Sequence, residues 1–322
     1  MMITSKNLAI VCPTKDRPEK IAKLLAAVAN NTSLPHQFII ANVGADIEDV
    51  VQDFKNTLNV KILNCPEPGQ ILQRHYAHQH LDPSISIVLH LDDDVILASD
   101  ALQKAIDHWN DASKDPTPIA GIALNITNYK DKKNNLFRYI AIMRVEPKGQ
   151  VWPSGFASPH TPVDQNITSN WLFGGATLWS RAVLQRHPHP LLFPTKWAFA
   201  EDLIYSYPLS KSYRMLICAQ AKGIHNDSYV DHPFGKRKFY GFTKVIMLYY
   251  FVSENKDLSM LAFSWMTLIQ FLAFFALALL GSKAHAGLAL GTAQGAIAVM
   301  KSIFAQSTHL ELVKRLASDQ AR

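Results

Sequence analysis

Apolar residues along the first 126 positions form short runs separated by stretches with helical spacing. The runs at 7–13, 36–43, 59–63 and 84–91 predict buried strands, and the spacing around them predicts helices at about 16–29, 46–57, 70–80 and 98–112. Strands and helices that alternate in this way are typical of a doubly wound α/β domain, whose mainly parallel sheet carries helices on both faces. We therefore expect an α/β fold for this part of the chain.

The first of these helices carries a start signal in its sequence. Asp16 is expected to cap it, Pro18 suits its first turn, and Glu19 supplies the acid of a capping box. These residues predict that the helix begins close to residue 16.

The C-terminal part has a different pattern. Residues 258–282 contain no charged side chain, and as a helix they would be roughly 37 Å long, enough to cross a hydrocarbon core of about 30 Å. Positive charges precede this segment, as is typical of its cytoplasmic side: Lys236, Arg237, Lys238 and Lys244. We predict a membrane-associated helix, and whether it spans the bilayer or lies in its interface stays open, because Ser and Thr residues give it a mildly polar side.

Three glycines follow at four-residue spacing, Gly287, Gly291 and Gly295. Such spacing gives a helix a small-residue face that permits close packing against another helix. A surface helix of small residues would have the same pattern, so both interpretations stay open.

Composition narrows the classes of ligand. The chain has 322 residues, 48% of them hydrophobic, and a formal net charge of +6. This balance suits a phosphate-bearing ligand or an anionic membrane surface, and no nucleic-acid-binding motif is recognisable. The cysteines, Cys12, Cys65 and Cys218, are odd in number and widely spaced, as expected for reduced thiols of a cytosolic protein.

Three consecutive carboxylates, Asp92, Asp93 and Asp94, follow the fourth predicted strand. Ligands bind at this carboxyl edge in open α/β sheets, and carboxylates so close together repel unless a cation lies between them. Mg²⁺ or Mn²⁺ bound by one or two acids and substrate phosphates would meet that need; a solvated loop is the alternative. A second acid pair, Glu201 and Asp202, could serve as a general base or mark a helix N-terminus.

Four segments together resemble a known family: "IVCPTKDRPEKI" near the start, "LDDD" after the fourth strand, "NWLFGGATLWSR" at 170–181 and "AEDLIYSYPLSK" at 200–211. In this order and spacing they look like the inverting family 2 glycosyltransferases of the GT-A fold, especially bacterial rhamnosyltransferase-like members that build surface polysaccharides. The resemblance implies a catalytic domain over 1–235, followed by a basic and aromatic helical region over 236–322 that contains the membrane-associated segment 258–282.

The resemblance also implies catalytic and metal-binding roles. Asp92 and Asp94 match the acid-x-acid motif, with Asp94 the more direct ligand of Mg²⁺ or Mn²⁺ and Asp92 nearer the ribose. Asp202 matches the catalytic base, with Glu201 beside it. His225 falls where some relatives place a histidine near the metal or the diphosphate, although a structural histidine is an equal alternative.

Other positions match the family's substrate contacts. The donor side comprises Thr14, Asp16, Asn42, Gly69, Gln70, Arg74 and Asp92, and the acceptor side comprises Trp171, Gly174 and Gly175. The chain departs from the family at two positions. Ala41 and Asn42 stand where the family commonly has an Asp that holds the nucleobase, and His75 stands where the family usually has an Asn. We expect Asp93 to point away from the site and to be replaceable.

The expected reaction is transfer of a sugar from a nucleotide-diphosphate donor to a hydroxyl, on a saccharide or lipid-linked saccharide, at the cytoplasmic face of a bacterial inner membrane. Two alternatives stay open: a nucleotidyltransferase that makes sugar nucleotides, which would normally have a Gly-rich phosphate loop after the first strand, and a non-catalytic sugar-nucleotide-binding protein. We do not expect zinc at His75, His78 and His80, because no acid or Cys lies at ligand spacing.

Overall fold

The computed structural model describes residues 2–192, 199–226 and 234–320. The chain forms two compact units, which we describe one at a time. The first comprises Met1–Asp131, His160–Lys196 and Tyr205–Asp227, and the second comprises Lys132–Pro159, Trp197–Ile204 and Ser228–Arg322. The sequence predicted a single domain boundary at residue 235, whereas each of these units consists of three separate segments of the chain.

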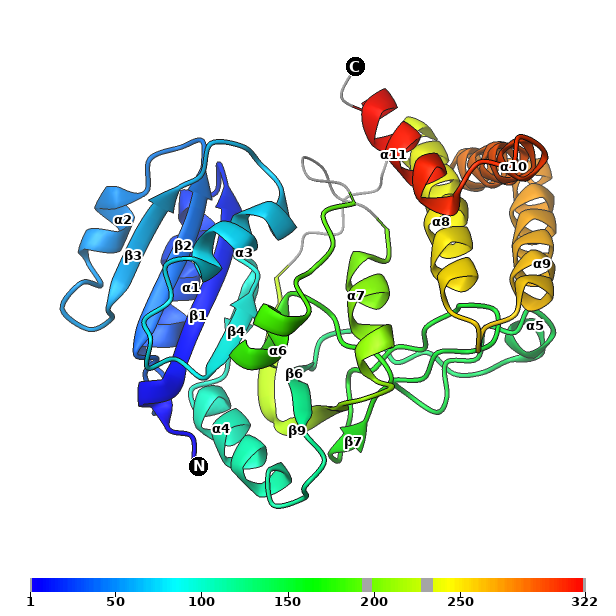
Figure 1. Ribbon diagram of the computed structural model, residues 1–322. Helices are drawn as coiled ribbons and strands as arrows, with labels where there is room; N and C mark the ends of the chain where they lie inside the picture. Colours follow the sequence, from blue (N-terminus) through cyan, green and yellow to red (C-terminus); the bar gives the residue numbers. More distant parts are fainter. Residues whose placement is uncertain (1, 193–198, 227–233, 321–322) are drawn as a thin grey trace. The chain divides into compact units, whose positions relative to one another are not determined.

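Within the described residues, the first unit forms a nine-stranded sheet with the order β3-β2-β1-β4-β8-β6-β9-β5, and β7 pairs with β9 (Figure 1). The strands are β1 (Leu8–Lys15), β2 (Gln37–Val43), β3 (Val60–Asn64), β4 (Ile87–Leu91), β5 (Val95–Leu97), β6 (Ile119–Ile126), β7 (Ile167–Thr168), β8 (Ala176–Ser180) and β9 (Arg214–His225). The four strands predicted from the sequence are thus all present, with ends shifted by at most three residues.

These first four strands run parallel to one another. β1 pairs with β2 and β4, and β2 pairs with β3, each in parallel register. Beyond β4 the sheet is mixed, because β8 runs antiparallel to both β4 and β6 while β6 and β9 are parallel. The carboxyl ends of β1, β2 and β4 therefore meet at one edge, which is where the predicted site residues lie.

Helices cover both faces of this sheet. They are α1 (Pro18–Ala29), α2 (Glu48–Gln52), α3 (Gln70–His78), α4 (Ala101–Ala112) and α6 (Arg181–Arg186). Strand residues alternate between two cores: in β1, Ile10 faces the core formed with α1, α2 and α4, and Val11 faces the core that includes residues of α3 and α6. The predicted doubly wound arrangement is confirmed.

The predicted cap of α1 is wrong in detail. The helix begins at Pro18, its N-cap position is Arg17, and no side chain caps it. Asp16 instead adopts a left-handed backbone with φ of 53°, and its Oδ1 accepts a hydrogen bond from the Ala45 N–H. Asp16 therefore fixes the loop after β2 and does not begin the helix.

The second unit is helical. It contains α5 (Leu136–Ile140), α8 (Phe234–Glu254), α9 (Met260–Leu279), α10 (Lys283–Phe304) and α11 (His309–Gln320), and α7 (Glu201–Leu209) begins in it. In Figure 1, α8, α9 and α10 lie side by side, and α8 and α10 share the most extensive contact of this group.

The glycine spacing in α10 explains this contact. A Cβ at Gly291 would lie within van der Waals overlap of the Lys238 carbonyl oxygen of α8, and a Cβ at Gly295 would lie 2.8 Å from Val245 Cβ. Only glycine lets the two backbones approach so closely. The packing interpretation of the spacing is confirmed.

Candidate functional site

The three aspartates lie directly beyond β4, at the edge where the parallel strands end. All five residues of β4 are buried, so the strand is held firmly in the sheet. The Asp92 N–H donates to the Gly175 carbonyl oxygen at 2.8 Å, which extends the pairing of β4 with β8 by one step. The backbone thus delivers the acids to a defined position.

Asp92 faces α3. Its Oδ1 accepts hydrogen bonds from Gln70 Nε2 at 2.6 Å and from Arg74 Nη2 at 2.8 Å, and the Arg74 side chain is almost completely buried. Gly175 lies against the carboxylate, because a Cβ there would be 2.2 Å from Asp92 Oδ2. The structure therefore brings together four predicted residues, and it gives Gly175 a second reason to be glycine besides its predicted acceptor-side role.

Asp93 is the most buried of the three acids, with its side chain 5% exposed. Thr14 Oγ1 donates to it at 2.7 Å and Arg17 Nη1 at 3.0 Å. Burial raises the pKa of Asp93, and the bonds from Thr14 and Arg17 offset part of that rise. This carboxylate ties β4 to β1 and to the start of α1, and its replaceability stays a prediction.

Asp94 faces two basic side chains. Lys20 Nζ lies 2.9 Å from its Oδ2, and His225 Nε2 lies 3.2 Å from its Oδ1. Burial opposes ionisation of Asp94, but the hydrogen bonds from His225 and Lys20 together outweigh it and hold its pKa well below the usual value. The structure thus brings His225, at the end of β9, to the acid that the sequence predicted as the direct metal ligand.

Two further donor-side candidates lie at the ends of neighbouring elements. Asn42, at the end of β2, donates from Nδ2 to the Ala45 carbonyl at 2.9 Å, while its Oδ1 is buried without a hydrogen-bond partner among the described residues. Gly69 immediately precedes α3, and its N–H donates to Gln73 Oε1. Asn42 therefore retains an unused acceptor at the sheet edge, where the family commonly has an acid.

The acceptor-side candidates Trp171 and Gly174 lie before β8. The Trp171 ring meets the His160 ring edge to face, with centroids 4.3 Å apart, and His160 is itself buried against Phe173. Burial lowers the pKa of His160 to about 3, so this histidine is neutral and acts as part of an aromatic cluster.

The two predicted catalytic acids, Glu201 and Asp202, lie in the first turn of α7. Glu201 is 9% exposed, and Asp202 is partly exposed. The residue before them, Ala200, has a φ of 63°, which is an uncommon left-handed conformation for alanine. α7 begins at the next residue. Both acids belong to the second unit, so they are placed by a different part of the chain from the three aspartates.

Sequence reasoning missed three residues of this site. Arg17 and Lys20 are the cations that meet Asp93 and Asp94, and Gln73 Nε2 donates to the Thr14 and Ala41 carbonyls, which joins the ends of β1 and β2. A usable signal existed for the cations, because they stand one helical turn apart directly after the first strand. Nothing in the sequence distinguishes Gln73 from an ordinary helix residue.

The donor set suits a divalent ion only in part. Within the described ranges, no group of three or more His, Cys, Asp and Glu side chains converges on one point. Asp94 and His225 are nevertheless adjacent, with Asp92 two residues away, and Mg²⁺ and Mn²⁺ are commonly bound through one or two carboxylates while substrate phosphates complete the coordination. The residues present fit an ion of that kind, for which the substrate supplies the remaining ligands.

The mainly parallel order of the first four strands and the acid cluster beyond β4 agree with the fold that the sequence motifs implied, and comparison with known proteins supports it. The family model described as Glycosyl transferase family 2 matches residues 9–160, which include the acid cluster. The match covers just under half of the chain and agrees with the resemblance to this family that the sequence motifs indicated.

Solved structures agree on the fold. The chain is similar to the mannosyltransferase PcManGT from Pyrobaculum calidifontis in complex with GDP-Man and Mn²⁺, with 15% identity, a TM-score of 0.55, and coverage of 97% of this chain and 84% of that chain. It is also similar to residues 1–349 of TarS from S. aureus, with 15% identity, a TM-score of 0.50, and coverage of 82% and 69%. No curated protein matches the chain. The predicted GT-A type α/β fold is confirmed.

Proposed function

We propose that the chain transfers a sugar from a nucleotide-diphosphate sugar to an acceptor hydroxyl, with inversion at the anomeric carbon. The observation that carries this proposal is the acid cluster beyond β4, in which each carboxylate meets side chains from a different element. The family of the N-terminal part supports it, and the similar fold of PcManGT was solved with a nucleotide sugar and Mn²⁺.

The donor's diphosphate would lie beside Asp94. Mg²⁺ or Mn²⁺, held by Asp94, Asp92 and His225, would neutralise charge on the departing diphosphate as a Lewis acid. Arg17 is half exposed at the edge of this cluster, and Lys20 lies beside it, so both can contact phosphate oxygens when the donor arrives. Asn42 would offer its unpaired Oδ1 to the nucleobase or ribose.

Asp202 would act as the general base. Its carboxylate accepts the proton of the acceptor hydroxyl while the hydroxyl oxygen forms a bond to the anomeric carbon. The bond between that carbon and the diphosphate oxygen breaks at the same time, and the electron pair leaves with the nucleotide. Because one displacement completes the transfer, the reaction needs no covalent intermediate and inverts the configuration.

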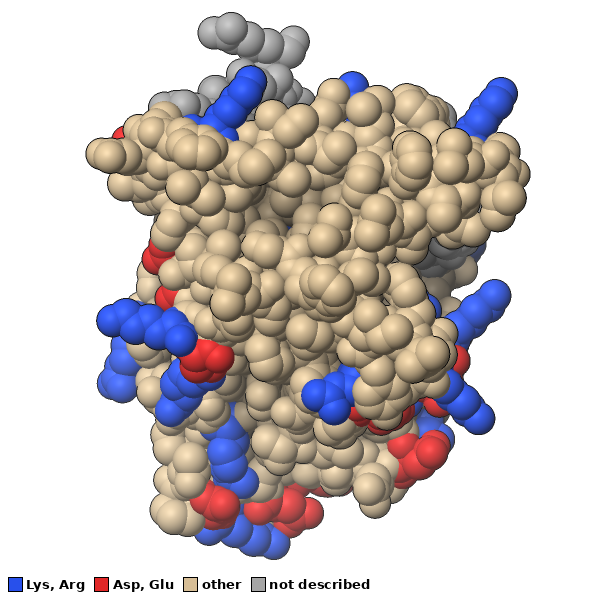
Figure 2. All heavy atoms as spheres, turned by 90° about the vertical axis from the view of Figure 1, so that its right-hand side faces the viewer, with Lys and Arg blue, Asp and Glu red and all other residues tan. Residues whose placement is uncertain are grey.

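The acceptor would be a lipid-linked saccharide of the kind used in surface polysaccharide assembly, met at the cytoplasmic face of a bacterial inner membrane. The second unit supports this part of the proposal. α9 and α10 are long and apolar enough to cross a bilayer by length and composition, and only 17% of the most apolar window of α9 is buried. Figure 2 shows a broad area without Lys, Arg, Asp or Glu side chains on the side where α9 lies in Figure 1.

Six of the exposed apolar residues of α9 form one stripe, which we call the α9 stripe: Leu261, Trp265, Leu268, Leu272, Phe275 and Leu279. They recur at alternating spacings of four and three residues, which places them on one face of the helix, and they are between 45 and 85% exposed. Large exposed apolar patches mark interaction surfaces. We propose that the α9 stripe contacts the hydrocarbon of the membrane that holds the acceptor.

A panel of nucleotide sugars tests the proposed reaction. Purified full-length protein should release a nucleoside diphosphate from one member of the panel when Mg²⁺ or Mn²⁺ is present, and chelation of the metal should stop the release. A chain that instead forms sugar nucleotides from a sugar phosphate and a nucleoside triphosphate would be a nucleotidyltransferase, and a chain that binds the donor without turnover would be a binding protein. Either result would overturn the proposal.

Membrane contact is tested separately by fractionation. The wild-type protein should stay with membranes after high-salt washing, and a variant with Leu268, Leu272 and Phe275 all replaced by Ser should partition at least ~100-fold less, because each buried side chain contributes about 1.5–3 kcal/mol. Leu191→Ser, an exposed leucine of the first unit, is the matched control and should partition normally. Carbonate extraction distinguishes the two forms of contact, since only a spanning helix resists it.

A further inference from the structure

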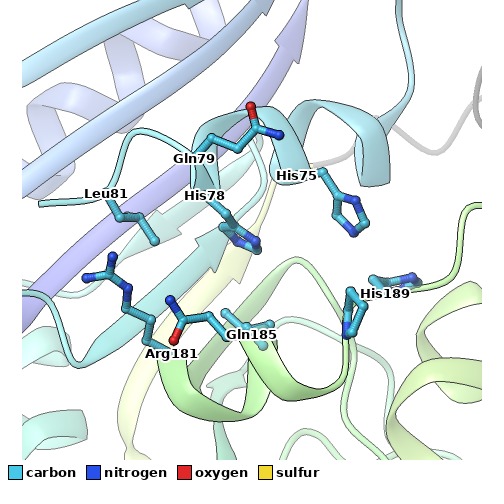
Figure 3. Close-up of a pocket in the computed structure, with 9 residues that line it drawn as sticks. His75, His78, Gln79, Leu81, Arg181, Gln185 and His189 are labelled. Carbon is cyan, nitrogen blue, oxygen red and sulfur yellow. The ribbon is translucent and has the colours of Figure 1, made fainter. Parts of the chain in front are cut away.

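A small pocket in the first unit is lined mainly by nitrogen-bearing side chains. It lies between α3 and α6, and its volume is about 210 Å³, room for about seven water molecules. Six polar residues line it: His75, His78, Gln79, Arg181, Gln185 and His189. Figure 3 shows Arg181 and Gln185 on one side of His78, with His75 and His189 on the other. The acid cluster contributes no residue to this lining.

The chemistry of the lining favours a ligand that accepts hydrogen bonds. No lining residue carries a carboxylate, whereas imidazole, amide and guanidinium groups all donate N–H bonds. Arg181 Nη1 donates to the Asp82 and Ile85 carbonyl oxygens at 2.6 and 3.1 Å, which fixes its permanent positive charge beside the pocket. A cavity with one sign of charge on its walls attracts an ion of the opposite sign.

His189 adds a direct indication of a missing partner. Both of its ring nitrogens are buried and meet no partner at hydrogen-bond geometry among the described residues, although the backbone of Pro190 lies close enough to favour the protonated ring. The ring stacks on Tyr205, with centroids 4.5 Å apart and planes 17° from parallel, so packing holds its orientation. A buried donor without an acceptor is costly, and a bound oxygen atom would remove that cost.

The histidines also report a positive environment. Burial, followed by the positive charge of neighbours including Arg74, lowers the pKa of His189 to about 3, and burial with His75, Arg74 and Arg181 lowers that of His78 to about 3. Each ring is therefore neutral near pH 7 and carries one N–H, although His78 Nε2 already meets His90 Nε2 at 2.8 Å. A negative ligand would be favoured by the same neighbours that disfavour protonation.

We propose that this pocket binds a small oxyanion of the phosphate class, either free or at the end of a phosphomonoester. Its size excludes a whole nucleotide sugar, since small-molecule sites for such ligands are usually ~300 Å³ or larger. Donors from both α3 and α6 surround the cavity, which suits the several oxygens of a tetrahedral anion better than a carboxylate with two. The proposal concerns a second site and does not depend on the proposed transfer reaction.

Calorimetric titration of the full chain with inorganic phosphate tests the proposal, with sodium chloride at equal ionic strength as the reference. Binding should be saturable and should weaken about tenfold or more in Gln185→Glu, because this change keeps the side chain's size and places a negative charge at the pocket. Gln185 is exposed, so the variant should fold. His80→Gln, two residues after the end of α3 and outside the pocket lining, is the matched control and should bind phosphate normally.

The outcomes separate the ligand sources and the rival explanation. Methyl phosphate that competes with phosphate would identify a phosphomonoester end as the ligand, and methyl phosphate that fails to compete would identify free phosphate; both results support the proposal. Absence of saturable phosphate binding would overturn it. Phosphate binding of equal strength in Gln185→Glu would overturn it too, because the anion would then be bound elsewhere, and so would acetate that binds as tightly as phosphate.

Discussion

The acid cluster of the first unit and the α8–α10 helix pair of the second unit are stabilised by different kinds of contact. Beyond β4, three like charges are stable because Arg74, Arg17 and Lys20 each meet one of them at 3.0 Å or less. Between α8 and α10, close approach depends on the absence of side chains at Gly291 and its neighbours. The acid cluster depends on pairs of opposite charges, and the helix contact depends on glycines that have no side chain.

This difference predicts how the two regions respond to change. A charge pair that faces the substrate can be weakened by an isosteric substitution that leaves the fold intact, so changes at Asp92 and Asp94 should affect substrate binding or catalysis. Asp93 is the exception in the cluster, because its carboxylate is buried against Thr14 and Arg17. Any side chain added at the glycines of the close helix contact would overlap the other helix, so changes there should affect stability. The predictions below test that division, from the largest expected effect to the smallest.

Asp202→Asn should lower the rate of sugar transfer by about 10²–10⁴-fold, since general base catalysis contributes on that scale. Donor binding should be unchanged, because the acid acts on the acceptor hydroxyl. Steady-state kinetics and equilibrium binding of the donor measure the two quantities. Glu201→Gln, one residue earlier, is the control and should have a smaller effect on rate; near-normal turnover of Asp202→Asn would remove this residue from the mechanism.

Gly291→Val should destabilise the second unit by about 3 kcal/mol, at the upper end for overpacking, because its Cβ would overlap the Lys238 carbonyl oxygen. Chemical denaturation followed by circular dichroism measures the loss. Gly235→Val provides the matched control in α8, where a Cβ would meet nothing within 4 Å, and its stability should be close to that of the wild type. Equal stability of the two variants would contradict the close packing of α8 and α10.

Asp93→Asn should lower the free energy of unfolding by about 1–3 kcal/mol, the usual cost when a buried hydrogen-bonded partner is altered. The reason is its position between Thr14 and Arg17. Asp111→Asn removes an exposed acid whose ion pair with Lys114 is also exposed, and it should change stability by less than about 0.5 kcal/mol. Equal stability of Asp93→Asn and Asp111→Asn would instead support the expectation that Asp93 is replaceable.

His160 should make stability depend on pH. Its pKa falls from 6.5 to about 3 in the folded chain because of burial, so the unfolded state binds the proton first. The stability is therefore complete above about pH 6.5 and decreases by about 1.4 kcal/mol per pH unit as the pH falls toward 3. Urea titrations between pH 7 and pH 5 should show a shallower slope in His160→Gln, whereas His36→Gln, at an exposed position, should keep the wild-type slope.

Local patterns predicted the first half of the sheet well. Strand residues such as Ile10 and Val11 alternate between two cores, so period and apolar runs were sufficient for β1 to β4 and their helices. The later strands were beyond this reasoning, because β8 and β9 pair with strands about 90 or more residues earlier and such pairing leaves no local signal.

The sequence predicted which residues belong to the candidate site better than it predicted how their side chains are oriented. The sequence indicated Asp92, Asp94 and His225, and the structure places His225 beside Asp94. It could not indicate that Asp93 turns inward, because the direction of a side chain beyond a strand depends on how the turn bends and on the partner at Arg17. Asp16 failed as a cap for a similar reason: the Ala45 N–H offered its side chain a better partner.

The metal dependence of nucleoside diphosphate binding tests the central claim most directly. Calorimetry with GDP and UDP, with and without Mn²⁺, should show that the metal strengthens binding of one nucleotide by at least ~10-fold in the wild type, because the carboxylate and the phosphates share the ion. Asp94→Asn should lose this strengthening, and circular dichroism should show that the variant still folds. Metal-strengthened binding of equal size in Asp94→Asn would contradict the assignment of the acid cluster as the donor site.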